Sequence, residues 1–373
     1  ITNSRAVIKA DNPWRPSASD KESSLYIAWL ANNDLTYEKK HELNFGIDAG
    51  FLNNRINFTF DIYTRRNYDL IGATNTMGIG GEPTKYGNVA KMKSNGVELS
   101  LNTVNIKTKD FTWTTDFIYS HMHNEVTELN TYNRLYDYIS GYGFTMPGYP
   151  QRSLFSIPFA GLNNEGLPTF YDPDGNITVT GIDMQEYDPE RLKFLKYEGP
   201  ADPTDVGSLG NIFRYKNLTL NLFITYSFGN VVRLDPVFSS EYSDLSATPK
   251  EFNNRWIKPG DEKFTNIPVI ASRQQLNNLA YLSRAYQSYN YSTARVAKGD
   301  FIRMKEISLA YEFPKTLTQP LHLSNLSLKL QATNLFLLYA DKKLNGQDPE
   351  FFNAGGVATP MPKQFTLTLK FGI

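Results

Sequence analysis

The stretch Lys363-Gln-Phe-Thr-Leu-Thr-Leu-Lys-Phe-Gly-Ile373 decides the fold. Its apolar side chains occupy every second position, and polar or small residues lie between them. A period of two with one apolar face is typical of a β-strand. Such a strand would be an adhesive edge in a soluble protein. A closed membrane barrel instead pairs its last strand with its first and turns the apolar face to lipid. The stretch therefore favours an outer-membrane β-barrel.

The composition agrees with this interpretation and excludes other classes. The 373 residues include 38 basic and 38 acidic side chains, so we expect no nucleic-acid partner bound through bulk charge. The absence of cysteine excludes a disulfide scaffold and cysteine-based catalysis. The mean hydropathy is −0.42 and no run approaches eighteen apolar residues, which argues against a transmembrane helix. The start, Ile1-Thr-Asn-Ser-Arg, has no signal-peptide pattern, so we expect a fragment of a longer polypeptide.

Alternating segments recur along the whole chain. The pair Asn53-Asn54 separates the first two and predicts a hairpin turn. Weaker candidates lie at 2–9 and 167–172. Strong candidate strands cover residues 39–51, 55–66, 96–104, 111–123, 151–162, 206–215, 218–228, 300–313, 325–337 and 363–373.

The connections between these strands alternate in length. Short ones lie at 52–54, 105–110, 163–166, 216–217 and 314–324, and long ones at 67–94, 124–150, 173–205, 229–299 and 338–362. Compact soluble domains seldom contain so many long loops, whereas outer-membrane barrels have short periplasmic turns and long extracellular loops. If 167–172 is an upward strand, the last strand runs downward. We therefore expect residues 1–373 to form one transmembrane barrel domain, without a second domain, and a periplasmic C-terminus.

Charged residues within the strands test the barrel interpretation. A Lys or Arg at the lipid midplane costs about 2–4 kcal/mol, so charges should face inward. The alternation predicts a polar lumenal face that carries Asp61, Glu98, Asp116 and Lys329. Arg303 and Lys305 instead share the parity of outward residues. We expect them either near lipid phosphates at the outer end of their strand or on a strand that projects into solvent.

The order and spacing of many short motifs resemble the C-terminal half of SusC/RagA-type TonB-dependent outer-membrane transporters. Each motif is weak alone, but together they extend over almost the whole sequence. The motifs are Leu35–Glu38, Asn44–Asp48, Asp61–Arg66, Tyr86–Asn88, Ser94–Glu98, Gly148–Pro150, Ala160–Leu162, Phe213–Lys216, Arg255–Trp256, Pro259–Asp261, Phe301–Leu309, Thr333–Leu335 and Asp348–Glu350.

This resemblance implies a 22-stranded barrel with a plug domain, of which the present residues supply about half the strands. The plug and the TonB-contacting segment would lie outside this sequence, as would the early strand that pairs with 363–373. The resemblance also implies a SusD-like surface lipoprotein that acts as a lid. Transport would be driven by the TonB complex, and the cargo would be oligosaccharide or oligopeptide. No cofactor is implied.

No catalytic motif is present: the sequence has no G-x-S-x-G, no H-E-x-x-H and no P-loop. We therefore expect no enzymatic activity. His121-Met-His123 has the spacing of a metal site, but its parity points outward, which favours a membrane-interface position over a metal. Asp172-Pro-Asp-Gly-Asn176 lacks the remaining ligands of a calcium loop and is better explained as a turn. We expect no bound metal.

Aromatic residues gather in two predicted loops. Aromatic faces stack on sugar rings, pack on peptides and anchor protein partners, although long loops also pack on themselves. The candidates for substrate or lid contact are Tyr138, Tyr142, Phe144 and Tyr149 in one loop and Trp256, Tyr286, Tyr289 and Tyr291 in the other, with Tyr132, Tyr136 and Tyr281 beside them.

Other functional classes stay open at this point. An outer-membrane barrel hydrolase would need acidic and histidine residues grouped at the inner side of the loops, and an adhesin would use the loops alone. A soluble lectin-like β-sandwich would pack the aromatic faces into a core. Solubility without detergent would separate the sandwich from the barrels.

Overall fold

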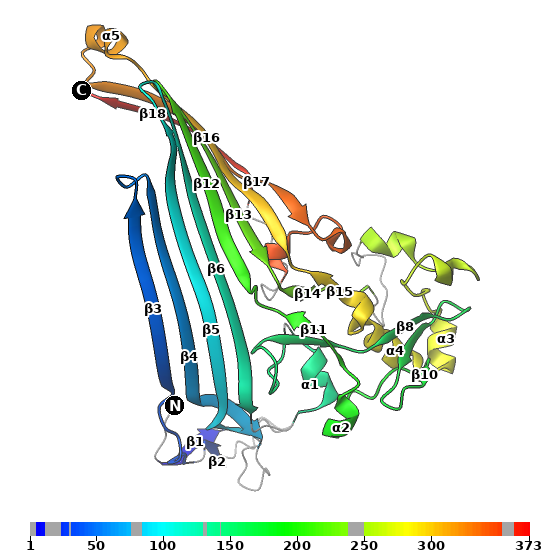
Figure 1. The fold of residues 1–373 in the computed structure, drawn as a ribbon. Helices are drawn as coiled ribbons and strands as arrows, with labels where there is room; N and C mark the ends of the chain where they lie inside the picture. The colour runs from blue at the N-terminus through cyan, green and yellow to red at the C-terminus, as the bar shows by residue number, and fades with distance from the viewer. Residues whose placement is uncertain are drawn as a thin grey trace, which may run out of the picture.

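The computed structural model describes residues 5–11, 24–29, 31–75, 84–129, 133–141, 143–237, 250–352 and 362–373. Its main element is a nine-stranded antiparallel sheet in which neighbours follow chain order (Figure 1). From edge to edge the strands are β3 (Lys39–Phe51), β4 (Ile56–Asn75), β5 (Thr84–Lys107), β6 (Phe111–Leu129), β12 (Asp205–Tyr215), β13 (Leu218–Phe228), β16 (Phe301–Glu312), β17 (Asn325–Ala340) and β18 (Gln364–Gly372).

Most of these strands lie where the alternation predicts them. β3 and β13 agree with their predicted segments residue for residue. The predicted long loop over 67–94 is wrong, because β4 continues to Asn75 and β5 begins at Thr84. A register shift between Asn67 and Leu70, with Asp69 at a φ of 55°, interrupts the alternation at that point. A bulge of this kind hides the continuing strand from a period-two search.

The two faces of the sheet differ in chemistry. One register row crosses five strands through Phe58, Leu101, Phe117, Leu209 and Ile224. We call this side the apolar face. Its side chains on β18 are 57% to 76% exposed, so nothing in the described protein covers them. The opposite side, which we call the polar face, carries mostly hydroxyl, amide and charged side chains.

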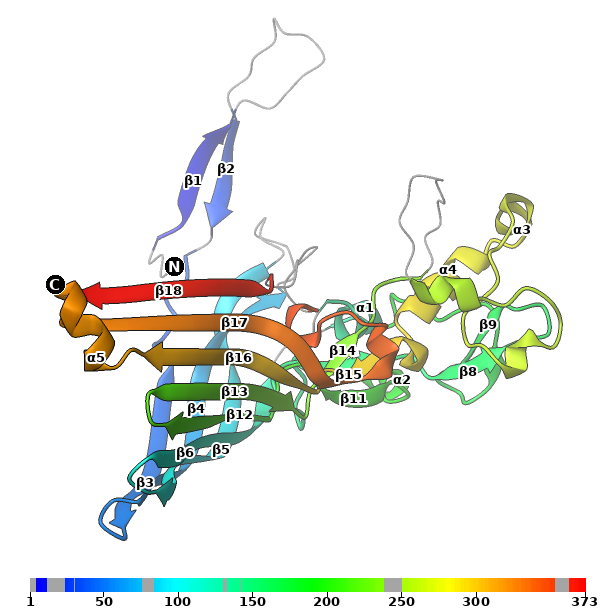
Figure 2. The same ribbon diagram turned by 90° about the horizontal axis from the view of Figure 1, so that it is seen from above.

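The long connections fold together at the end of the sheet that is opposite the short turns, and we call them the loop layer (Figures 1 and 2). The loop layer contains small sheets made of β8 to β10, of β7 with β11, and of β14 with β15. Its helices and strands are α1 (Leu135–Ile139), β7 (Ser153–Ser156), β8 (Phe159–Leu162), β9 (Pro168–Tyr171), β10 (Ile177–Thr178), α2 (Pro189–Leu192), β11 (Lys196–Pro200), β14 (Val231–Arg233), α3 (Arg273–Asn278), α4 (Leu282–Asn290) and β15 (Val296–Lys298).

The prediction that 151–162 and 167–172 are strands of the main sheet is therefore wrong. β7 and β8 divide the first segment, and β9 lies in the second, all within the loop layer. Alternation predicts a strand but does not tell which sheet it joins. Removing these two segments takes two strands from the main sheet, and an even number of strands leaves the predicted direction of β18 unchanged. The N–H of Ser324 in the last short turn donates to the carbonyl of Gly372, so the C-terminus lies at the short-turn end.

The buried core lies in the loop layer rather than under the sheet. Its largest cluster joins α1, β9, α2 and α4 through Leu135, Ile139, Phe170, Leu192 and Tyr289. A separate hairpin of β1 (Val7–Asp11) and β2 (Ser24–Trp29) projects away from the sheet (Figure 2). The weak strand expected at 2–9 thus overlaps β1, while residues 2–4 lie outside the described part. Among the described residues, no helix combines the length and apolar character needed to span a membrane.

Candidate functional site: the polar face and the loop layer

The polar face brings three of the predicted lumenal carboxylates onto neighbouring strands. Asp61 on β4 is the register partner of Glu98 on β5. The amide of Asn102 donates to Asp116 Oδ1 on β6 at 2.5 Å. Lys329 lies farther across the sheet on β17, where its Nζ is 3.8 Å from Glu306 Oε1. The described residues contain no group of three or more His, Cys, Asp or Glu side chains suited to a metal.

The same face carries a packed arginine, Arg65, that the alternation does not indicate. The Arg65 guanidinium lies 4.0 Å from the ring centroid of Tyr63, and its Nε is 3.1 Å from Glu42 Oε2. Tyr63 lies flat over Gly96, where an added Cβ would meet the phenol oxygen at 2.5 Å. Any larger residue at Gly96 would displace the ring. In the alternating pattern Gly96 is an ordinary polar-face position, so the pattern does not predict the contact between the Tyr63 ring and Gly96.

Arg303 does not lie on the face that the alternation predicts. Phe223 pairs with Glu306 and the next residue, Ile224, pairs with Met304, so Lys305 is an extra residue in β16. This bulge reverses the parity and turns Arg303 to the polar face. There it is 6% exposed and forms ion pairs with Asp348 and with Glu350, the latter at 3.2 Å. Both predicted positions for Arg303, lipid phosphate and solvent, are therefore wrong.

The first aromatic group forms a connected cluster of tilted and edge-to-face rings in the loop layer. The ring centroids of Tyr138 and Phe144 are 4.8 Å apart, and Tyr149 lies 5.1 Å from Phe155. Phe155 also meets Tyr138 at 6.1 Å and thereby joins the two pairs. Tyr142, like Tyr132, lies outside the described residues. The described rings pack on one another: Phe155 is buried, while Tyr138, Phe144 and Tyr149 keep part of their surface exposed.

The second aromatic group is more deeply buried. Tyr286 and Tyr289 on α4 are each 1% exposed, and the Tyr286 hydroxyl donates to the carbonyl of Val269 at 2.5 Å. Burial raises the pKa of Tyr289 to about 12. Trp256 is buried and donates from Nε1 to Glu262 Oε2 at 3.1 Å. For these three side chains the contacts are those of a loop core.

The remaining aromatic candidate joins the two groups. Tyr291 meets Tyr136 edge to face, with ring centroids 5.9 Å apart. Tyr281 packs at the edge of the smaller cluster that contains Tyr286. The two predicted loops thus form one aromatic layer, a proximity that their separation in sequence does not reveal. Their contact with substrate or lid stays a prediction.

The two minor motifs take ordinary structural positions. His121 shares the apolar face with Tyr119, and its Nδ1 is 2.8 Å from Asp205 Oδ1, which also accepts the Tyr119 hydroxyl. At the other motif, the backbone N–H groups of Asp174 and Asn176 both donate to Asp172 Oδ1, and Gly175 has a φ of 83°. The turn predicted at 172–176 is confirmed.

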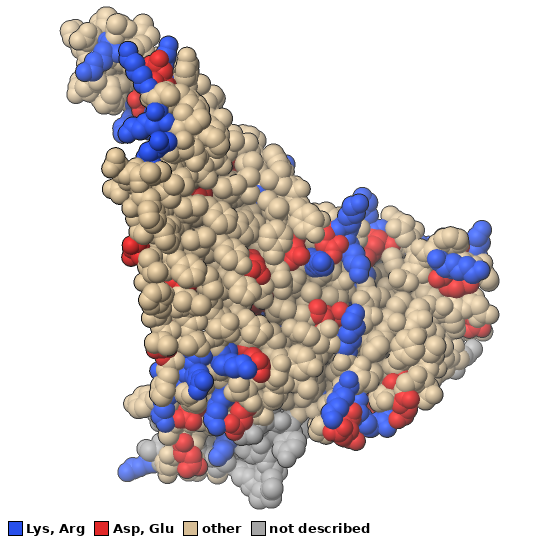
Figure 3. All heavy atoms as spheres, in the orientation of Figure 1, with Lys and Arg blue, Asp and Glu red and all other residues tan. Residues whose placement is uncertain are grey.

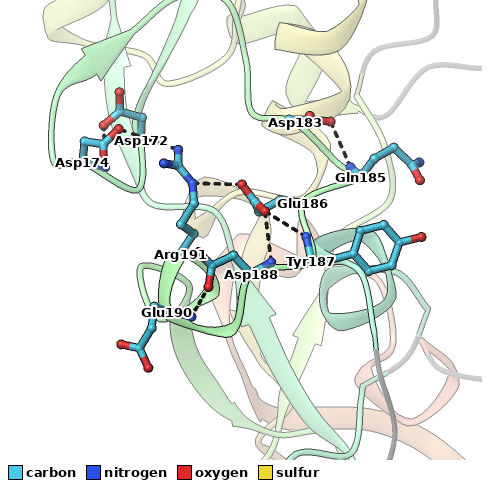
Figure 4. A network of polar contacts seen from close by, with 9 residues as sticks. All are labelled: Asp172, Asp174, Asp183, Gln185, Glu186, Tyr187, Asp188, Glu190 and Arg191. Atoms are coloured by element: carbon cyan, nitrogen blue, oxygen red, sulfur yellow. Dashed lines mark hydrogen bonds and ion pairs between the residues drawn. The ribbon is translucent and has the colours of Figure 1, made fainter.

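A polar network surrounds this turn (Figure 4). Arg191 lies between Glu186, with Nε 2.9 Å from Oε2, and Asp174, at 3.7 Å. The backbone N–H groups of Asp188 and Tyr187, together with Arg191, hold the pKa of Glu186 below its usual range. An open groove of about 210 Å³ is lined by Glu186, Arg191 and Arg284, among others. Fixed carboxylate and guanidinium groups of this kind can bind hydroxyl-rich or peptide ligands.

No protein-family model matches the chain. The RagAB peptide transporter superposes with a TM-score of 0.74 at 24% identity, covering 99% of this chain and 38% of the transporter chain. Its open-open state gives a TM-score of 0.73. This likeness shows the fold: the nine-stranded sheet and the loop layer have the fold of part of the RagAB transporter chain.

The sequence relatives are TonB-dependent receptors. TonB-dependent receptor P39 of Formosa agariphila is 26% identical over 373 residues, which is 89% of this chain and 34% of that receptor. TonB-dependent receptor SusC of Bacteroides thetaiotaomicron is 28% identical over 355 residues, which is 91% of this chain and 32% of SusC. The chain is a distant homologue of the SusC/RagA-type TonB-dependent receptors and spans about a third of their length. These receptors are transporters and not enzymes.

Proposed function

We propose that this chain forms part of the barrel wall of a TonB-dependent importer in a bacterial outer membrane. The observation that carries the proposal is the exposed apolar face, which only lipid or further protein can cover. The described sheet is open, with β3 and β18 at its edges. In the proposed assembly both edges pair with further strands, and a plug domain occupies the lumen beside the polar face.

The short-turn end, with the C-terminus, would face the periplasm, and the loop layer would face outward. A SusD-like lipoprotein would close over the loop layer, by analogy with the two-component name of RagAB. The cargo would be an oligosaccharide or an oligopeptide. Tyr138, Phe144, Tyr149 and Tyr291 are the aromatic candidates that keep exposed surface for cargo or lid.

The loop layer also presents two apolar side chains that suit a protein partner. Ile257 is 66% exposed and Phe264 is 89% exposed. The segment between them is held by Asp261 Oδ2, which accepts the N–H groups of Ile257 and Lys258 at 3.1 and 3.0 Å. A rigid segment loses little entropy when it binds, so this pair suits contact with the lid.

The test uses the complete polypeptide in its native host. We expect it in the outer-membrane fraction, with extraction only by detergent, and we expect uptake of a labelled oligomer to stop in a deletion strain and in a strain that lacks TonB. Solubility without detergent would refute the barrel. Continued uptake without TonB would refute energy coupling. Binding of the purified complex to glycan and peptide libraries would identify the cargo.

A further inference from the structure

The two ends of the sheet differ in how their charges are paired. At the loop end, Lys91 lies 2.6 Å from Glu128 and Lys93 lies 2.9 Å from Glu125. At the short-turn end lie seven basic residues and two acidic residues, Asp110 and Glu312, and none of the seven has an ion-pair partner among the described residues. Lys and Arg side chains gather at this end of the molecule (Figure 3, top). We call these seven the basic rim: Arg55, Lys107, Lys109, Arg214, Lys216, Lys315 and Lys370.

Part of the basic rim lies directly beside the apolar face. The Lys216 amine is 5.5 Å from the ring centroid of Tyr215, which shares the apolar face with its register partner Phe111. Arg55 donates to the carbonyls of Val104 and Asn105, both at 3.0 Å, in the neighbouring strand. Aromatic rings followed by lysine or arginine are the arrangement that proteins place at lipid headgroup level.

The last short turn adds an apolar surface at the same end. Helix α5 (Lys315–Thr318) protrudes beyond the sheet at the top of Figure 1. Leu317 is 56% exposed, and Leu321, three residues after the helix, is 62% exposed. Exposed leucines beside a lysine suit a segment that lies in the membrane interface. The short-turn end therefore combines apolar, aromatic and basic groups.

The register divides the basic rim into two sets. Lys107 and Arg214 are both register partners of Thr112, and Lys370 is that of Ser327, which places these three on the polar face. We call these three the polar-face set. The other four lie in the turns and in α5, and we call them the turn set: Arg55, Lys109, Lys216 and Lys315. Strand register does not assign the turn set to either face of the sheet, and Lys216 of this set lies beside the apolar-face ring of Tyr215.

We propose that the turn set binds the phosphodiester headgroups of anionic phospholipids in the leaflet at the short-turn end. This inference rests on the proposed function, because it requires the apolar face to be embedded in a bilayer. The unpaired cations, the adjacent rings and the exposed leucines favour lipid over an acidic protein segment. A protein segment in the lumen would be attracted to the polar-face set instead.

The test is lipid retention by the complete protein in nanodiscs of phosphatidylglycerol and phosphatidylethanolamine, read by native mass spectrometry. A basic residue near an anionic surface contributes about fivefold in affinity at low ionic strength. We therefore expect the wild type to retain phosphatidylglycerol preferentially. The variant Arg55→Gln/Lys109→Gln/Lys216→Gln/Lys315→Gln should lose this preference by at least about tenfold.

The matched control is Lys107→Gln/Arg214→Gln/Lys370→Gln, which should stay within about twofold of the wild type, and excess inorganic phosphate should not displace the lipid. Equal retention of both lipids by the wild type would overturn the inference. Loss of the phosphatidylglycerol preference in the control variant alone would also overturn it and would point to a lumenal acidic segment. An equal loss of this preference in both variants would overturn it as well. If the protein enters the discs without lipid preference, the import proposal stands; if it does not enter them, both proposals fail.

Discussion

The main sheet and the loop layer use the same apolar residue types for opposite environments. Leu369 in the sheet is 59% exposed, whereas Phe170 in the loop layer is fully buried. The sheet is held by its backbone ladder and leaves one apolar face open, while the loop layer has a core of its own. The sheet therefore depends on a surrounding apolar medium, and the loop layer does not.

The largest expected effect concerns the contact between the two regions. Arg303 on the sheet holds Asp348 and Glu350 of the loop layer, so Arg303→Leu leaves the mostly buried Asp348 carboxylate unpaired. Breaking a buried ion pair in this way costs about 3–5 kcal/mol. We expect hydrogen exchange of residues 341–351 to accelerate accordingly in the detergent-solubilised protein. Lys305→Leu, at the bulge, is the control and should change little. If residues 341–351 exchanged equally fast in both variants, the Arg303 ion pairs would not be what holds this part of the loop layer to the sheet.

The same residue marks the limit of prediction from sequence. Alternation predicts β13 residue for residue because each of its apolar side chains faces one medium without interruption. It fails at Arg303 because a single extra residue, Lys305, reverses the parity. Alternation also assigns 151–162 to the wrong sheet, because a short strand in a loop core and a membrane strand show the same alternation of apolar and polar residues. The polar-face position of the carboxylates could be predicted, whereas the meeting of the two aromatic loops depends on contacts distant in sequence, such as that of Tyr136 with Tyr291.

A cavity in the loop core should disturb one region only. Phe170→Ala removes a fully buried ring that packs 6.1 Å from Phe159. The loss of burial and the cavity cost about 3 kcal/mol of loop-layer stability. Limited proteolysis should then cleave the loop layer while the sheet stays protected. Tyr171→Ala, at an exposed neighbour, should have little effect. Loss of the sheet together with the loops would contradict the independence of their stabilities.

A charge on the apolar face should disturb the other region only. Leu222 lies at the centre of β13 with Asn211 and Ile307 as register partners. Leu222→Arg would place a guanidinium against hydrocarbon at a cost of about 2 kcal/mol. Asn221→Arg is the control, because Asn221 lies on the polar face with its amide 3.3 Å from Glu306 Oε1. We expect reduced folding into vesicles for the first variant only. Equal folding of both would argue against lipid at this face.

The smallest effect tests whether the loop layer is stabilised by ordinary local capping. Asp188 caps α2: its Oδ1 accepts the N–H of Glu190 at 3.0 Å, and its carbonyl accepts the N–H of Leu192 at 3.0 Å. Asp188→Ala should cost about 1 kcal/mol, seen as faster exchange of the Leu192 amide. Glu190→Ala removes only an exposed pair with Lys193, so its effect should be smaller. Because α2 lies in the loop layer, neither change should alter folding of the sheet into vesicles. An effect of Asp188→Ala on vesicle insertion would mean that the two regions fold as one unit.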